Sequence, residues 1–174
     1  MKKLFILFIA LVGFGVSSYG QNNATATSSA TIVTPIKITH VANLNFGNLT
    51  VGTTGGDITL TPAGTLTGET GTVKAPKSGE GSVTAAEFTV EGQANYVYTI
   101  SVLPASVTLK DVNGTGTHTM TLTNWATTPT PTGQLDASAG SQTLKVGGTL
   151  TLSGSQAAGS YKGTEDISVT VNYQ

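Results

Sequence analysis

The chain has 174 residues, of which 10% are charged, and it contains no arginine and no cysteine. Without Lys2 and Lys3, which belong to the leader described next, six lysines face nine acidic residues, a net charge of −3. This balance argues against nucleic acid as a partner, because Lys and Arg supply most of that affinity by neutralising phosphates. Since disulfides are excluded, burial of apolar side chains must hold the fold together.

Residues 1–20 have the pattern of a signal peptide. Lys2 and Lys3 precede an apolar run over residues 4–16, and Ser18 and Gly20 occupy the −3 and −1 positions before a predicted cleavage at Gln21. The alternative is a retained anchor, but the run is shorter than the roughly 20 apolar residues needed to span a bilayer. We expect a secreted protein that passes through the periplasm to the cell surface or the exterior, with no membrane span after cleavage.

An uncharged extended segment follows the cleavage site. We define residues 21–34 as the arm and expect residues 35–174 to form one domain. Small apolar side chains share one face of the arm and are the candidate assembly residues: Ala24, Ala26, Ala30 and Ile32. Two interpretations stay open: the arm pairs with another molecule, or it remains with its own chain as a first strand or a disordered leader.

The rest of the chain alternates apolar and polar residues in short stretches. Abundant Thr, Val and Gly predict an all-β domain. The expected strands are residues 31–38, interrupted at Pro35, and 44–47, 57–61, 86–91, 96–102, 106–110, 117–123, 143–146, 149–152 and 167–174. Their spacing predicts an antiparallel sandwich or barrel, and we favour the sandwich.

Turns and loops are predicted between these stretches. A hairpin turn is expected at residues 92–95, between the strands 86–91 and 96–102, and further turns at Asn113 with Gly114 and at Gly147 with Gly148. Residues 127–133, with Pro129 and Pro131, are expected to form a loop.

The last stretch alternates to the end of the sequence and carries no Lys or Pro. A strand edge without such residues promotes association with another strand. Its inward residues are the candidate acceptor or terminal strand: Ile167, Val169, Val171 and Tyr173.

No catalytic constellation is evident. His40 and His118 lack companion ligands, and the calcium-like run from Asp111 to Gly114 has Leu122 where an acidic residue would be required. Glu165 and Asp166 are adjacent and so face opposite ways on a strand. We expect no enzyme activity, no cofactor and no metal.

Trp125 is the one aromatic residue considered as a ligand contact. It lies beside the proline-rich loop, where an exposed indole would stack on a sugar. The competing interpretation, which we favour, is that Trp125 packs in the core.

Several short phrases together resemble the DUF4402 family of exported bacterial proteins. They are residues 31–38, Leu44-Asn45-Phe46-Gly47, residues 88–92, Ala158-Gly159-Ser160-Tyr161-Lys162-Gly163, and residues 169–173. The last two are also similar to the spore coat U domain and to archaic chaperone–usher pilins. The resemblance implies an immunoglobulin-like, pilin-like β-sandwich and, for the pilin relatives, assembly by donor-strand complementation with a periplasmic chaperone and an outer-membrane usher. Pilin donor strands usually present bulkier side chains than this arm does.

These observations predict a structural subunit of a surface filament or extracellular matrix that self-associates through strand exchange. The alternative is a cell-surface adhesin or carbohydrate-binding module with a self-complete sandwich and Trp125 in its site.

Overall fold

The computed structural model describes residues 22–75, 81–113 and 117–174, and the chain divides into two units, Met1–Ile32 and Val33–Gln174. In the first unit, residues 22–32 form neither helix nor strand and their side chains are exposed. We call the second unit the β-domain. The predicted signal peptide and Gly114 of the predicted Asn113-Gly114 turn lie outside the described residues.

The β-domain is built from antiparallel strands, and no helix occurs among the residues described, which confirms the all-β prediction. The strands are β1 (Lys37–Ala42), β2 (Asn45–Phe46), β3 (Gly56–Leu60), β4 (Leu66–Thr67), β5 (Val83–Thr84), β6 (Ala86–Glu91), β7 (Val97–Leu103), β8 (Val107–Asp111), β9 (Thr119–Thr128), β10 (Thr132–Gln134), β11 (Ser141–Leu152), β12 (Tyr161–Gly163) and β13 (Ser168–Tyr173).

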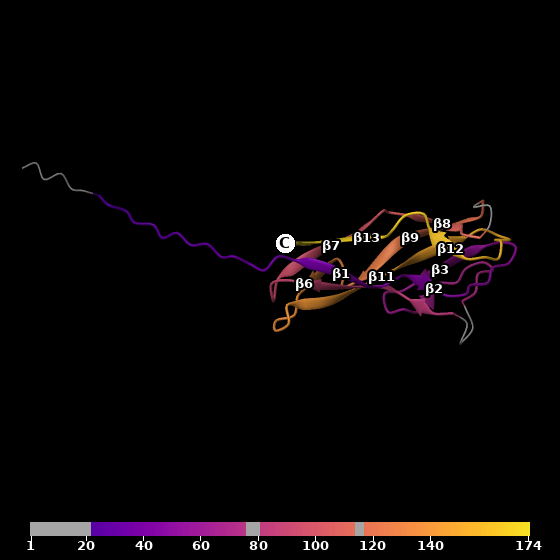
Figure 1. Cartoon of the computed structure of the whole chain (residues 1–174), viewed down its shortest axis with the longest axis horizontal. Helices are drawn as coiled ribbons and strands as arrows, with labels where there is room; N and C mark the ends of the chain where they lie inside the picture. Colours follow the sequence, from indigo (N-terminus) through magenta and orange to yellow (C-terminus); the bar gives the residue numbers. More distant parts are fainter. Residues whose placement is uncertain (1–21, 76–80, 114–116) are drawn as a thin grey trace, which may run out of the picture. The chain divides into compact units, whose positions relative to one another are not determined.

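The largest sheet is organised around β11. Its strands follow the order β1-β6-β11-β9-β8-β12, with β3 also pairing with β11 and β4 pairing with β3. The first half of β11 pairs with β6 and the second half with β3, while β9 lies along its other edge (Figure 1). The sheet therefore branches at the middle of β11.

Gly147 and Gly148 lie inside β11, so the prediction of a turn between two strands was wrong. A Cβ atom at Gly147 would collide with the carbonyl oxygen of Leu60, where the end of β3 approaches. A Cβ atom at Gly148 would lie 3.0 Å from the Trp125 ring. The pairing with β9 shifts register between Gly147 and Thr149, as at a β-bulge. Close backbone approach, rather than a turn, explains these glycines.

The hairpin predicted at residues 92–95 was also wrong, because β6 and β7, which these residues join, belong to different sheets and do not pair. Two strand boundaries differ from the prediction as well. The first strand begins only at Lys37, after Pro35, because proline cannot donate to a strand ladder. It then continues through His40 to Ala42. Strand β9 continues to Thr128 instead of ending at Thr123, and the loop shrinks to residues 129–131 before β10.

Two smaller sheets, β10-β7-β13 and β2-β5, complete the β-domain. Alternate residues of each strand point into one of two hydrophobic clusters. The first cluster comprises Phe46, Ile58, Leu60, Val73, Val107, Leu122, Leu150 and Leu152. The second joins the largest sheet to the three-stranded sheet and comprises Ala86, Phe88, Val90, Tyr98, Leu135, Leu144, Val146 and Val171.

Tyr98 is the largest fully buried side chain. Its hydroxyl donates a 2.7 Å hydrogen bond to Oε1 of Gln142, and burial raises the pKa of Tyr98. This bond satisfies the one polar atom that Tyr98 brings into the second cluster.

Candidate functional site

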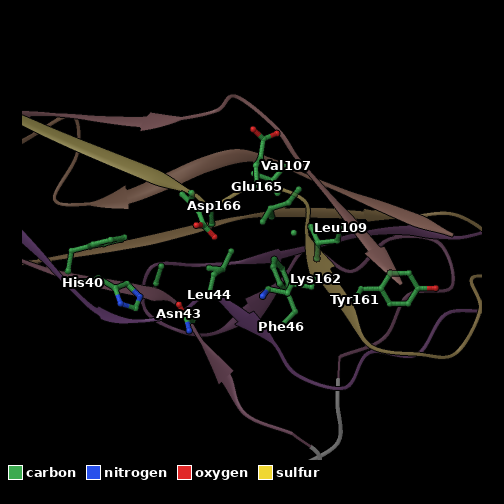
Figure 2. A pocket seen from close by; sticks show the side chains of 15 residues that line it. His40, Asn43, Leu44, Phe46, Val107, Leu109, Tyr161, Lys162, Glu165 and Asp166 are labelled. Carbon is green, nitrogen blue, oxygen red and sulfur yellow. The ribbon is translucent and has the colours of Figure 1, made fainter. Parts of the chain in front are cut away.

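A groove of about 700 Å³ opens between residues 40–46 and residues 161–167 (Figure 2). Core side chains from both clusters line it: Phe46, Ala86, Phe88, Val107 and Leu122. Its polar lining consists of His40, Asn43, Lys162, Glu165 and Asp166. We call it the charged groove, because an apolar lining is combined with ionisable side chains.

A second cavity of about 680 Å³ adjoins the charged groove, since Leu44, Phe46, Leu109 and Tyr161 line both. It lies between residues 44–51 and residues 156–161, with Leu109, Met120, Leu150 and Leu152 contributing apolar side chains. Among the described residues, no Asp, Glu, Lys, Arg or His lines it. We call it the uncharged hollow.

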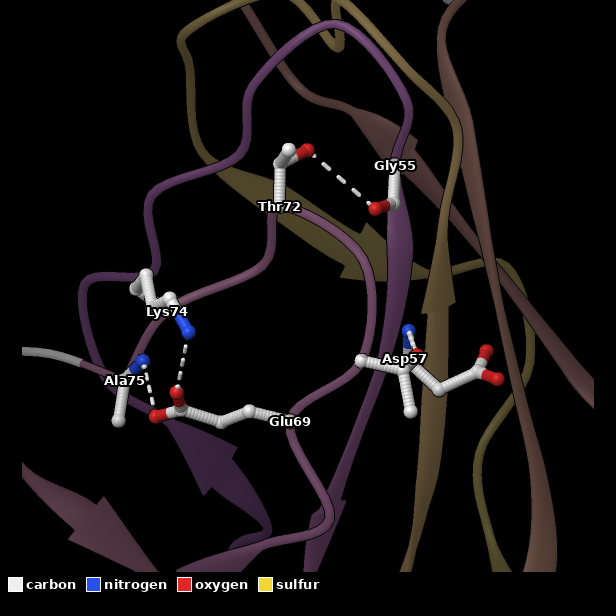
Figure 3. Close-up of polar contacts among 7 residues, drawn as sticks. Gly55, Asp57, Glu69, Thr72, Lys74 and Ala75 are labelled. Atoms are coloured by element: carbon white, nitrogen blue, oxygen red, sulfur yellow. Dashed lines mark hydrogen bonds and ion pairs between the residues drawn. The ribbon is translucent and has the colours of Figure 1, made fainter.

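One wall of the uncharged hollow is braced from outside by Glu69. Thr50 and Lys74 exchange backbone hydrogen bonds of 3.1 and 2.9 Å, which tie residues 48–51 to the loop behind them. The Glu69 carboxylate accepts bonds of 2.9 Å from the Ala75 N–H and 3.1 Å from Nζ of Lys74 (Figure 3). The Ala75 N–H, and then the Lys74 ammonium, lower the pKa of Glu69. These hydrogen bonds favour the ionised form of this carboxylate.

The opposite wall contains Gln156. Its Nε2 atom is buried and has no hydrogen-bond partner within residues 22–75, 81–113 and 117–174. Close by, the Tyr161 hydroxyl donates a 2.7 Å bond to the carbonyl of Ala157, which holds the turn. Sequence reasoning missed Gln156, because residues 153–160 show no alternation that would mark them as part of a cavity.

Strand β12, next to both cavities, ends the largest sheet. The Ser160 carbonyl accepts a bond from Val112, and the Thr164 N–H donates to the Thr108 carbonyl. Alternate residues of an antiparallel strand face the same neighbour, so Lys162 also faces β8. Tyr161 and Gly163 therefore direct their backbone N–H and C=O groups away from β8, toward an edge where no described strand pairs.

Three of the four predicted terminal-strand residues, Val169, Val171 and Tyr173, lie on one side of β13, which pairs only with β7 among the described strands. Val171 is buried in the second cluster, and Val169 and Tyr173 pack against it. Ile167 precedes β13, packs against the first cluster and lines the charged groove. The alternation is as predicted, while the acceptor role of these residues stays a prediction.

Tyr173 also fixes the beginning of the β-domain. Its hydroxyl accepts a 2.6 Å bond from the Gln93 N–H and donates a 2.8 Å bond to the Thr34 carbonyl. The Thr34 N–H donates to Oε1 of Gln93 at 3.2 Å. These three bonds hold Thr34, where the arm ends, on the β-domain.

The candidate assembly residues of the arm, Ala24, Ala26, Ala30 and Ile32, lie in the first unit and are all exposed. Ile32 is 97% exposed. Burial of such an exposed apolar side chain is stabilising, by about 1.5–3 kcal/mol when the burial is complete.

Trp125 lies in β9 and packs against both clusters, and its indole N–H donates a 2.7 Å bond to the Pro104 carbonyl. The indole is partly exposed, and its one polar group is already engaged. Its role as a ligand contact stays a prediction.

Of the other polar residues weighed in the sequence, His40, Glu165 and Asp166 line the charged groove, while Asp111 and His118 do not. His40 packs edge-on against Phe88 with ring centroids 5.6 Å apart, and His118 precedes β9. Within the described ranges, no group of three His, Cys, Asp or Glu side chains is placed to hold a metal ion. In the same ranges, no helix has the length and apolarity required to cross a bilayer.

Comparison with known proteins gives one match. A family model described as "Domain of unknown function (DUF4402)" matches residues 36–173, which covers most of the chain and agrees with the family resemblance expected from the sequence. No curated protein and no solved structure matches.

Proposed function

The chain belongs to the DUF4402 family, and from this premise we propose that it is a secreted structural subunit of a bacterial surface filament or extracellular matrix. In this proposal the β-domain is an immunoglobulin-like sandwich related to pilin domains. Subunits assemble by strand complementation, with the arm of one copy completing the β-domain of the next.

The observation that carries the proposal is the pair of adjoining cavities, the charged groove and the uncharged hollow, which core side chains line. Phe46, Phe88 and Leu122 belong to the hydrophobic clusters, yet they also line a cavity of about 700 Å³. A cavity lined by core side chains leaves dispersion contacts unmade, so a segment that fills it is stabilising. The arm is an uncharged segment, and the side chains of its residues 22–32 are exposed.

Backbone pairing supplies the second contribution. The outer edges of β12 and β13 are without a described partner strand. An added strand gains main-chain hydrogen bonds there, while its alternate side chains enter the cavity. Because donor and acceptor surfaces differ, each contact leaves one free arm and one free groove, and the product is a filament.

A filament subunit of this kind also needs protection before assembly. An unfilled apolar groove promotes non-specific association. A periplasmic chaperone and an outer-membrane usher are therefore candidate partners, each covering the exposed cavities until the arm of another subunit replaces it.

The proposal is tested by electron microscopy of the purified mature chain, residues 21–174, alongside a chain that begins at residue 35. Gel electrophoresis of unboiled and boiled samples measures the same assemblies in solution. We expect filaments and a heat-sensitive ladder for the longer chain alone. Monomers from both chains would refute strand complementation and favour a self-complete binding module.

A matched pair of substitutions separates the arm's side chains from its mere presence. Ile32→Asp should abolish the ladder, because burying an unpaired carboxylate is strongly unfavourable. Thr31→Asp places the same charge on the opposite face of an extended segment and should retain assembly. Equal assembly by both variants would contradict a buried Ile32.

A further inference from the structure

We propose that the uncharged hollow, with Gln156 as its hydrogen-bond donor and the outer edge of β12 as its backbone partner, receives the arm of a second copy of this chain. This inference rests on the proposed function. It assigns the receiving site to the hollow rather than to the charged groove or to β13, and it makes Gln156 the residue that determines register.

Charge distinguishes the two cavities. The charged groove includes Lys162, Glu165 and Asp166, whereas no Asp, Glu, Lys, Arg or His among the described residues lines the hollow. The arm is itself without charge from Asn22 to Thr34. Burying an apolar and hydroxyl-bearing segment beside charged groups would cost part of their hydration, and the hollow imposes no such cost.

Gln156 identifies what the occupant must supply. Its buried Nε2 donor has no partner among the described residues. A buried donor left unpaired is unfavourable and is rare in native proteins. A backbone carbonyl of an extended peptide is an acceptor that every residue of the arm can present, so arm binding would satisfy this group.

The edge of β12 gives the direction of the incoming strand. Tyr161 presents its N–H and C=O groups away from β8 and also lines the hollow. A strand paired there extends the largest sheet beyond β12 and points alternate side chains over Leu109 and the other apolar lining residues.

The arm matches the space as well as the polarity. Its alternate residues Ala24, Ala26 and Ala30 are small, and Ile32 is the one large apolar side chain among the candidate assembly residues. A cavity of about 680 Å³ is within the roughly 300–1,000 Å³ typical of ligand sites. A shallow strand of small side chains with one bulkier anchor fits such a volume.

The absence of cysteine from the chain allows a direct test. Full mature chains carrying Ala30→Cys are mixed with chains carrying Ser160→Cys, at the hollow, or with chains carrying Thr170→Cys, on β13. Both acceptor positions are exposed. Under mild oxidation we expect disulfide-linked heterodimers with the Ser160 variant and few with the Thr170 variant.

The outcomes separate the two proposals. Arm-dependent polymers that crosslink at Thr170, or at neither position, would overturn the assignment of the hollow and leave strand complementation standing. Absence of polymers from the unsubstituted chain would overturn both the proposed function and the assignment of the hollow. A chain carrying both Ala30→Cys and Ser160→Cys that closes as a monomer would show that the arm fills its own hollow and would also overturn the inference.

Gln156→Leu provides a second measurement. Because Nε2 of Gln156 has no partner in the single copy, its removal should leave the unfolding temperature of the monomer unchanged or higher. Loss of one hydrogen bond across the interface should weaken assembly about fivefold. Unchanged assembly, or an equal loss of monomer stability and assembly, would contradict the assigned role.

Discussion

Replacing Tyr173 with Phe removes a hydroxyl that joins three parts of the β-domain. The hydroxyl accepts a 2.6 Å bond from the part-buried Gln93 N–H and donates a 2.8 Å bond to the exposed Thr34 carbonyl. A neutral hydrogen bond contributes about 0.5–1.5 kcal/mol net, and the exposed one contributes at the low end. We therefore expect the free energy of unfolding to fall by about 1.5 kcal/mol.

The measurement is thermal unfolding followed by circular dichroism, in an Ile32→Asp background so that assembly does not add to stability. For a domain of this size the loss corresponds to a fall of about 3–8 °C in Tm. The matched control is Tyr96→Phe. The Tyr96 ring contacts the Tyr173 ring edge-on with centroids 5.4 Å apart, but its hydroxyl has no hydrogen bond within the described residues. Equal Tm values for the two variants would refute the reasoning.

Three further predictions concern the core, the branch point and the braced wall. Trp125→Ala should lower the free energy of unfolding by about 3–5 kcal/mol, because the ring packs against both clusters. Trp125→Phe should lower it by about 1 kcal/mol, because only the hydrogen bond to Pro104 is lost. Urea titration of the two variants measures this difference. Gly147→Val should destabilise the β-domain by about 3 kcal/mol or more, because its side chain would collide with the Leu60 carbonyl, and a native-like urea midpoint would contradict this. The lowered pKa of Glu69 means that its stabilisation is complete above the unfolded-state pKa near 4.3 and is lost as pH falls through the folded-state value. The stability difference between the unsubstituted chain and Glu69→Gln should therefore be present at pH 7 and shrink below pH 4, and a difference that stays constant with pH would be inconsistent with this.

The strands that the sequence predicted best are those with undisturbed alternation. Residues 86–91 were expected as a strand with Phe88 and Val90 on one face, and β6 has those bounds with both side chains buried. Tyr98 in β7 and Leu122 in β9 are also buried, although the bounds of these two strands differ from the predicted ones. Local alternation is sufficient there because each strand has one buried and one solvated face.

The errors arise where distant segments set the local conformation. Gly147 and Gly148 have the composition of a turn, and only the approach of Leu60 and Trp125 explains why both lie within a strand. The short strands β4, β5, β10 and β12 were not predicted, because a strand of two or three residues shows too little alternation to be detected in the sequence.

The candidate site was predicted only in part. The arm and the terminal strand follow from charge and alternation, which are local properties. The uncharged hollow depends on residues 44–51 and 156–161 lying opposite each other, and no local pattern encodes that separation. Gln156 acquires its importance from burial without a partner, which is a property of the folded chain alone.

The position of β11 in the largest sheet determines how the β-domain folds. Without β11, the β1–β6, β3–β4 and β8–β9 pairs share no hydrogen-bonded neighbour in that sheet. Each pair of strands is marginal in water until a further strand or a packed face supports it. Residues before Ser141 therefore gain a common framework only when β11 joins them, through pairings that are distant in sequence and so slow to form. We therefore expect folding of the β-domain to be one late, cooperative event rather than gradual growth from its first strand.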